Sequence, residues 1–591
     1  MNQFILVGPI LSFRGMQDGV WKVSMLIGIH QVATEPLPQV FLDGKQCAEP
    51  VALLELEGLQ VLRFDLSCKM GESSERHNYK IAGVNHQWHF TVPGRQEMPH
   101  LAYVSCNGIS HPEKLKDRDD YPHRAWRDLV NSHDLCLRRN AFSADSNQVW
   151  LDNKMRQTGT QRFHLLMMGG DQIYMDSIWE NIEELKAWTH LSEAKKRDYQ
   201  VPDELKQKIE QYYYVNYLNN WLQSGRTVWD DTDVDGHYDG ADAMAVIPTI
   251  MMWDDHDIFD GWGSYHAEWQ VCPLFNTLFA CARQAFWVFQ LQNSIGALPE
   301  LVRDPLMPGG FLPLSWQAYK KDDPLALPLL DQQAGFTSLF KMYGLVLIAA
   351  DLRSERTRQQ IIGLASWNQI KAALIAINDG HEQMHIESVI FMSSVPMIYP
   401  DLIMLPNAFD FISHDDVQES NLDDVRDHWA HADHAGERDK VIETLLQLAD
   451  RRGVDIYIVS GDVHVAARGY AADRRQRESP RQKSLTQLIS SAVMNPFASG
   501  FKDYFFLFYL NLLVRQDEIN SAHHLQMLPF PSYSKYIMPE RNWLALDFNK
   551  VEGATKHKLW VTWRCEGKRG FTSHYYVAQA GHENDLFPPD A

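Results

Sequence analysis

The sequence predicts an α/β protein in which buried strands alternate with helices, preceded by a small β-sandwich. Three observations favour this class. The first 97 residues have the period of half-buried strands, six short apolar runs follow at wide intervals, and helical patterns lie between some of these runs. At 591 residues the chain also exceeds the size at which one hydrophobic core usually stops growing, so more than one domain is expected.

The N-terminal part has the simpler pattern. Apolar residues occupy alternate positions in 21–25, 62–66 and 88–92, as expected for strands with one buried face. A Pro-Gly pair directly after the third stretch interrupts the pattern. We therefore expect a small β-sandwich domain over residues 1–97.

The rest of the chain, residues 98–591, is expected to form a larger second domain. Helical patterning is clearest in IWENIEELKAW and DELKQKIEQYYYVNYLNNWL. These stretches predict a helical insertion at about residues 177–245.

Each of the six apolar runs after residue 97 leads into polar residues. The runs are LAYV, FHLLMMGG, PTIMMW, LVLIAA, SVIFM and IYIVSG. Ligands of α/β folds bind beyond the carboxyl ends of strands, so these ends are expected to meet in one site. Helix capping is the alternative for any one of them, because Asp and Ser are common N-caps, but several acids and histidines together favour a site. The polar residues are Ser105, Cys106, Asn107, Asp171, Asp254, Asp351, Arg353, Ser393, Ser394, Asp462 and His464.

The segment WDDHD, residues 253–257, places three carboxylates and an imidazole directly after an apolar run. Such groups are costly to bury unless they are paired or bound to a cation. The segment therefore predicts a metal ion and partners from the other strand ends.

Composition argues against nucleic-acid binding and favours a reducing compartment. A formal net charge of −21 argues against general nucleic-acid binding, because a phosphate backbone would be repelled. Seven singly scattered cysteines suit a reducing compartment. The N-terminus has no basic leader with a sustained apolar core, so we expect no signal peptide and a cytoplasmic location.

The most hydrophobic segment is YFFLFYLNLLV, residues 504–514. It is too short to span a bilayer, which needs ~20 apolar residues, so no transmembrane segment is expected. A core or lid helix is the favoured interpretation, and a membrane-surface helix is the alternative.

Three motifs in order, GGDQIY, WDDHD and SGDVH, resemble those of the metallophosphatase superfamily and, within it, the alkaline phosphatase D (PhoD-like) family. VSCN, DLRSERT, SSVPM and DHWAHADHAGERD support the resemblance, which covers most of residues 98–550. It implies a four-layer αββα sandwich. It also implies a phosphohydrolase that cleaves phosphate esters with a metal-activated hydroxide.

The resemblance also implies the ligands of two metal ions. Asp171 is expected to bridge them, Asp255 to bind one, and Asp462 and His464 to add a ligand and a substrate contact. Tyr174 and Cys106 favour iron(III), because a tyrosinate is a hard anionic ligand and a thiolate is unsuited to magnesium alone. For Cys106 alone, an inert buried thiol is the alternative. Iron(III) and calcium are the expected ions, with manganese, zinc or magnesium as substitutes.

Two residues are expected to act on the substrate. His256 is placed to protonate the leaving oxygen or to stabilise the transferring phosphoryl group. Arg353 is a candidate clamp for two phosphate oxygens, and a surface ion pair with Glu355 or Asp351 is an equally favoured alternative.

Neighbouring polar residues are expected to support these groups. Asp254 and Asp257 are interpreted as orienting groups, and Asn107 as an orienting or substrate-contacting residue. Secreted family members have an asparagine-containing segment after the aspartate-histidine motif, where this chain has DIFDGWGSY. Asp260 is the substitute ligand that we expect there.

An acidic segment, DTDVDGHYDGAD, resembles the first half of a calcium-binding loop. Its twelfth residue is Asp where the standard loop has Glu, and a strand follows, so a solvated acidic turn is the favoured alternative. The candidate ligands are Asp231, Asp233, Asp235, Asp239 and Asp242.

The histidines of DHWAHADH, residues 427–434, recur at every third position. They could form a metal-binding face, but a helix surface over the active site is favoured.

The leading hypothesis is a metal-dependent phosphatase acting on a small-molecule phosphate ester. A phosphodiesterase acting on nucleotide or phospholipid-like esters is the alternative enzyme. A non-catalytic metal-binding scaffold is the alternative outside enzymes, although the intact set of strand-end acids and histidines argues against it.

Overall fold

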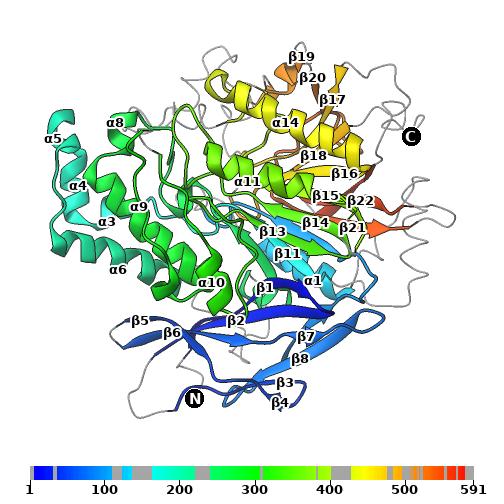
Figure 1. Ribbon diagram of the computed structural model, residues 1–591, viewed down its shortest axis with the longest axis horizontal. Coiled ribbons are helices and arrows are strands. Elements are labelled where there is room, and N and C mark those ends of the chain that lie inside the picture. Colours follow the sequence, from blue (N-terminus) through cyan, green and yellow to red (C-terminus); the bar gives the residue numbers. More distant parts are fainter. Residues whose placement is uncertain are drawn as a thin grey trace.

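The computed structural model shows a mixed α/β protein built on two large sheets (Figure 1). It describes residues 5–30, 36–56, 58–109, 123–135, 163–219, 240–306, 310–380, 384–400, 428–474, 484–495, 507–508, 510–514, 518–519, 523–550, 556–567 and 570–578.

The first sheet has eleven strands and contains three of the six predicted strands that end in polar residues. These three, β10, β11 and β12, are adjacent and parallel, so their carboxyl ends lie at one edge. The strand order is β23 (Gly570–Ala578), β22 (Lys558–Gly567), β21 (Asn542–Asn549), β10 (Leu101–Val104), β11 (Leu165–Gly169), β12 (Thr249–Met252), β1 (Ile5–Gln17), β2 (Val20–His30), β6 (Leu59–Asp65) and β5 (Val51–Leu56), with β7 (Cys68–Lys69) beside β2.

The second sheet has eight strands and contains the other three predicted strands, β14, β15 and β16, again adjacent and parallel. All six strands predicted from the apolar runs are therefore confirmed. The order is β13 (Ser338–Met342), β14 (Gly344–Ala349), β15 (Ile386–Ser393), β16 (Asp455–Ser460), β18 (Ser484–Ser490), β17 (Ala466–Asp473), β20 (His523–Leu528) and β19 (Glu518–Ile519).

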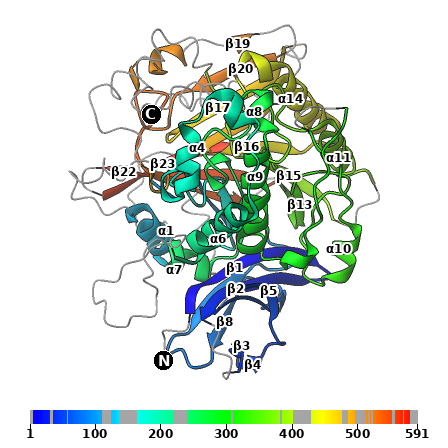
Figure 2. The same ribbon diagram turned by 90° about the vertical axis from the view of Figure 1, so that its left-hand side faces the viewer.

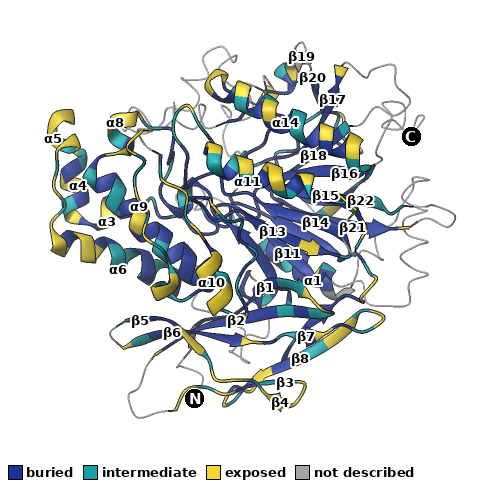
Figure 3. Ribbon diagram, in the orientation of Figure 1, coloured by how far each residue is buried: buried dark blue, intermediate teal, exposed yellow. Residues whose placement is uncertain are grey.

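The second sheet is buried on both faces, which explains why its strands are continuous apolar runs. In β14, Leu345 and Leu347 belong to the core shared with the first sheet, whereas Val346 and Ile348 pack in a separate core with α11 and α14. Figure 3 shows β14 to β16 in the buried colour, beneath helices whose outer surfaces are exposed.

Helices lie on both sides of the pair of sheets (Figure 2). Helices α11 and α14 cover the second sheet, and α1, α6 and α7 lie against strands of the first. The helices are α1 (Arg124–Leu135), α3 (Ile178–Asn181), α4 (Glu183–Thr189), α5 (Glu193–Arg197), α6 (Asp203–Asn219), α7 (Gly240–Val246), α8 (Ala267–Gln270), α9 (Pro273–Ala285), α10 (Gln317–Asp322), α11 (Leu364–Ile375) and α14 (Ala432–Arg452). Short helical turns are the 3₁₀ turns η3 (Asp255–Asp257) and η5 (Ile295–Ala297) and the π-helical turn η4 (Phe286–Gln290).

Helix α14 shows how local sequence sets an element near the site. His431 caps its N-terminus by accepting from the Asp433 amide, and Gly453 ends it in the left-handed conformation with φ of 67°. Val441, Ile442 and Leu445 then face the second sheet.

The N-terminal strands are part of the first sheet. Strand β1 pairs in parallel with β12 at Ser12 and Thr249, and β2, β6 and β5 continue the same sheet. A separate four-stranded sheet, in the order β4 (Lys45–Gln46), β3 (Val40–Leu42), β8 (Glu75–Ile81) and β9 (Trp88–Val92), lies beside them. The domain boundary at residue 97 stays a prediction.

The hydrophobic segment near residue 510 contributes buried and exposed side chains. Leu507, Leu510 and Val514 are buried, whereas Phe508 and Leu512 are exposed. Within the described ranges, no helix has the length and apolar character needed to cross a membrane.

Candidate functional site

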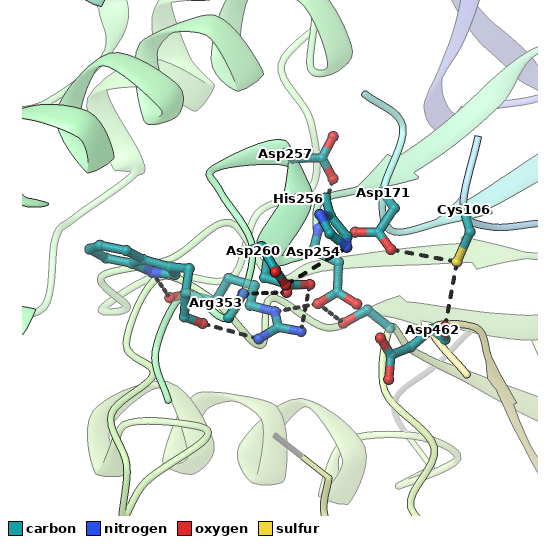
Figure 4. A network of polar contacts seen from close by, with 12 residues as sticks. Cys106, Asp171, Asp254, His256, Asp257, Asp260, Arg353 and Asp462 are labelled. Carbon is teal, nitrogen blue, oxygen red and sulfur yellow. Dashed lines mark hydrogen bonds and ion pairs between the residues drawn. The ribbon is translucent and has the colours of Figure 1, made fainter. Parts of the chain in front are cut away.

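The six strand ends bring their polar residues into one network between the two sheets (Figure 4). Cys106, Asp171 and Asp254 follow β10, β11 and β12, and Arg353, Ser394 and Asp462 follow β14, β15 and β16. Hydrogen bonds link the two groups across the sheets, since Arg353 and Ser394 both donate to Asp254.

A cluster of four carboxylates occupies the centre of this network. One oxygen from each of Asp171, Asp254, Asp255 and Asp462 lies within 4.8 Å of the others. The first three side chains are buried, and Asp462 is partly exposed. Carboxylates at such spacing repel one another unless a cation lies between them, so the cluster could bind metal.

The backbone at the strand ends is unusual. Cys106, Asp171, Asp462 and His464 all have positive φ, between 52° and 68°, where non-glycine residues are uncommon. This conformation turns the chain sharply just after each strand. Gly170 allows the close approach, because a Cβ there would lie 2.8 Å from that of Asp254.

Asp171 provides a test of whether the cluster fits a cation. Its Oδ1 atom is buried and has no hydrogen-bond partner among the described residues. Burial raises the pKa of Asp171 well above its usual value; His256 opposes this effect, and the carboxylates of Asp254 and Asp255 add to it. An ionised Asp171 in this position needs a cation, so the site fits one.

Arg353 balances part of this charge from the second sheet. Its side chain is 0% exposed, Nε donates to Asp254, Nη2 lies 3.1 Å from Asp255 Oδ1, and Nη1 donates to the Trp262 carbonyl at 3.1 Å. The alternative for Arg353, a surface ion pair with Glu355 or Asp351, is therefore wrong, because the side chain is buried against Asp254 and Asp255. The guanidinium holds two protein carboxylates, which differs from the open phosphate clamp that the sequence suggested.

His256 lies beside the carboxylate cluster and is held from two sides. Its Nδ1 donates to Asp176 Oδ2 at 2.8 Å, and its ring stacks on Tyr174 with a centroid distance of 4.3 Å. Burial disfavours the imidazolium, but Asp176 and Asp255 outweigh that effect and hold the pKa of His256 well above its usual value. The Nδ1–H group is held by its hydrogen bond to Asp176, and Nε2 lies on the side of Asp260, 4.0 Å from its Oδ1 atom.

The sequence prediction missed Asp176. The residue follows Asp171 by five positions in GDQIYMD, and an acid just beyond a metal motif was the available signal. It also accepts the Asp260 amide at 2.7 Å and so joins two loops. Asp260 itself lies 4.0 Å from His256 Nε2, and Asp255, His256 and Asp260 form a second group that could hold a cation.

Cys106 and Tyr174, the two predicted iron ligands, lie near Asp171 and His256, respectively. The Cys106 thiol is 3.5 Å from Asp171 Oδ2 and 3.0 Å from Ser491 Oγ. The Tyr174 ring passes over Gly108, where a Cβ would come within 2.0 Å of it. Burial raises the pKa of the Cys106 thiol and of the Tyr174 phenol. Each would therefore release its proton only when a bound cation stabilises the resulting anion.

Asn107 and His464 occupy less central positions. Asn107 accepts from Trp126 Nε1 at 2.8 Å and donates to the Gln172 carbonyl at 3.3 Å, so it braces the Asp171 loop. His464 is partly exposed, and its amide donates to Ser491 Oγ at 3.2 Å.

Two other predicted segments have different outcomes. The acidic loop lies mostly outside the described residues, which exclude Asp231, Asp233, Asp235 and Asp239. Asp242 is described and is half-buried in the first turn of α7.

In the histidine motif, His428 Nε2 lies 3.9 Å from Asp462 Oδ2, so His428 reaches the site.

Comparisons with known proteins identify the family of the chain. The sequence profile of the PhoD related phosphatase family matches residues 74–305 and 412–503. An uncharacterized protein of Saccharomyces cerevisiae is 25% identical over 522 residues, which cover 79% of this chain and 66% of the yeast protein, just under two thirds of its length. The chain belongs to the PhoD related phosphatase family.

Proposed function

We propose that this protein is a metal-dependent phosphohydrolase that cleaves a small-molecule phosphate ester. The observation that carries the proposal is the convergence of Asp171, Asp254, Asp255 and Asp462 within 4.8 Å. Family membership supports phosphoesterase chemistry at these carboxylates.

Asp171, Asp255 and Asp462 would hold the cations, with Cys106 and Tyr174 favouring iron(III) at one position and calcium as the second ion. His464 and Asp260 would complete the ligand set. Bound cations would lower the pKa of a water molecule and offset the negative charge on the phosphate oxygens.

The protein groups have separate tasks around the substrate. His256 carries a proton on Nε2 and delivers it to the leaving oxygen, while Asp176 keeps the ring oriented through Nδ1. Arg353 holds Asp254 and Asp255 in place by hydrogen bonds to both. Burial of the cluster strengthens each of these electrostatic interactions.

For the fold, the proposal retains the four-layer αββα arrangement of the metallophosphatases. The placement of α11 and α14 over one sheet and of α1 and α7 against the other supports it. A β-sandwich domain over residues 1–97 before the catalytic domain is proposed with it.

Metal-free protein reconstituted with Mn²⁺, Ca²⁺ or iron(III) should hydrolyse p-nitrophenyl phosphate or bis(p-nitrophenyl) phosphate. The ratio of the two rates separates a monoesterase from a diesterase. Asp65→Asn, at an exposed acid on β6, is the control and should match the wild type. Stoichiometric metal binding with no hydrolysis of either ester would contradict the proposal and favour a non-catalytic scaffold.

The identity of one metal has its own test. If Tyr174 binds iron(III) as a tyrosinate, the oxidised protein should show a visible charge-transfer band that Tyr174→Phe removes. Tyr212→Phe, at a tyrosine on α6, should leave the band unchanged. A colourless and fully active enzyme containing only zinc or magnesium would contradict this assignment.

A further inference from the structure

Asp257 connects the two loops that carry most of the metal-site carboxylates. Its Oδ1 atom accepts the amides of Gln172 and Ile173 at 3.1 and 3.2 Å, and its Oδ2 atom accepts the amide of Asp254 at 2.8 Å. One carboxylate thus ties the Asp171 loop to the end of β12. The side chain is 1% exposed, so no solvent replaces these contacts.

Asp257 is itself held by Gln290, a residue that lies outside every motif of the sequence. Gln290 Nε2 donates to Asp257 Oδ1 at 2.8 Å and to the Tyr217 hydroxyl at 2.9 Å, which uses both protons of the amide. Gln290 is buried, and Tyr217 belongs to α6. A continuous buried path therefore runs from α6 through Gln290 to the site loops.

The backbone at Gln290 adopts a rare form. Phe286–Gln290 is a π-helical turn that directly continues α9, and the Leu291 amide bonds the Phe286 carbonyl at 3.0 Å. Single π-turns re-aim side chains and are often found at functional sites. Stacking of Phe289 on Tyr217, with centroids 4.6 Å apart and planes 2° apart, holds the turn against α6.

We propose that Gln290 is a positioning residue for metal binding: its amide holds the Asp257 carboxylate and through it sets the placement of the Asp171 loop against Asp254 and Asp255. The inference rests on the proposed metal site but not on the reaction performed there.

The contacts explain why a neutral amide at this position matters. Without Gln290 as a donor, Asp257 keeps three backbone donors but loses the side-chain contact that fixes its rotation. Since its two oxygens bond different loops, rotation of the carboxylate loosens both. Loss of a partner that orients metal ligands typically weakens metal binding by about 10–100-fold.

The matched variants are Gln290→Met and Gln292→Met. Both residues are fully buried glutamines two positions apart, but Gln292 donates to the Ile10 carbonyl and accepts from Ser24, away from the site. Calorimetric titration of metal-free protein with Mn²⁺ should show about 10–100-fold weaker binding for Gln290→Met. Gln292→Met should bind Mn²⁺ as tightly as the wild type does, although its Tm should fall by about as much as that of Gln290→Met.

Amide hydrogen exchange of the metal-free proteins gives a second measurement. The amide protons of Gln172, Ile173 and Asp254 should exchange faster in Gln290→Met than in the wild type. In Gln292→Met their exchange rates should equal those of the wild type. Should Gln290→Met not fold, Tyr217→Phe replaces it. That variant removes the second acceptor of the Gln290 amide and should weaken Mn²⁺ binding by about 2–10-fold.

Wild-type Mn²⁺ affinity together with wild-type amide exchange in Gln290→Met, or equal losses in both glutamine variants, would overturn the inference. A protein that binds Mn²⁺ but hydrolyses no ester would refute the proposed function and leave the role of Gln290 testable by the same titration.

Discussion

The two large sheets contribute different chemistry to the same site. Strands β11 and β12 of the eleven-stranded sheet lead to Asp171, Asp254 and Asp255, all buried acids. Strands β14 and β15 of the eight-stranded sheet lead to Arg353 and Ser394, which both donate hydrogen bonds to Asp254.

This difference shows how buried like charges are accommodated here. The first sheet supplies most of the negative charge. The second sheet supplies the Arg353 guanidinium and the Ser394 hydroxyl, which both donate to Asp254. Asp462, which follows β16, is the member of the four-carboxylate cluster that comes from the second sheet, and it is partly exposed. A bound cation would complete the balance, so variants on the two sides should fail in different ways.

The largest effect is expected on the acidic side. Asp171→Ala should lose bound metal and hydrolysis together, because the ions that it holds would supply both the nucleophile and the charge stabilisation; the rate should fall by about 10⁴-fold or more. Metal analysis and ester hydrolysis on the same preparation measure both. An Asp171→Ala protein with full metal content would refute its role as a ligand.

His256→Ala should retain metal and lose turnover. General acid catalysis contributes about 10²–10⁴-fold, so the loss should be large for an alkyl phosphate and much smaller for an activated phenolic ester. A leaving-group series at fixed metal content checks this. A defect of equal size across the series would refute proton donation by His256, and a loss of metal as large as in Asp171→Ala would make His256 a ligand instead.

On the cationic side, Arg353→Met should act first on stability. Breaking a buried ion pair by removing one partner typically costs about 3–5 kcal/mol, because a buried charge is left uncompensated. Urea unfolding of the metal-free protein measures this loss, which should shrink when Mn²⁺ is present because the cation offsets the same carboxylates. An identical loss with and without Mn²⁺ would show that Arg353 and the cation do not share Asp254 and Asp255.

The smallest of these effects is expected for Asp176→Asn. The amide keeps the shape of the side chain but weakens its hold on the His256 ring, so turnover should fall by about 10–100-fold with KM nearly unchanged. Asp198→Asn, at a residue just after α5, is the matched control. A change confined to KM would place Asp176 in substrate binding instead.

The strands and the strand-end acids were predictable from local sequence. Leu345, Leu347 and Ile348 stand in a continuous apolar run, and such runs indicate strands covered on both faces. The positions of Asp171, Asp254 and Asp462 follow, because parallel strands end at one edge of a sheet.

The sheet partners of the N-terminal strands were not predictable in the same way. The alternation of Trp21, Val23 and Met25 establishes a strand with a buried face, but it does not say which strand lies alongside. Pairing of β1 with β12 depends on which edge of the first sheet is open, and that is decided only when the whole sheet forms.

The sequence by itself determined the residue types of the site, because periodicity and local polarity are properties of short segments. The tertiary structure decided their pairing. Arg353 reaches Asp254 over 99 positions, His256 reaches Asp176 over 80, and Gln290 reaches Asp257 over 33. Such contacts join residues far apart in the chain, and the one made by Gln290 also depends on the π-helical turn that contains it, so no local pattern encodes them.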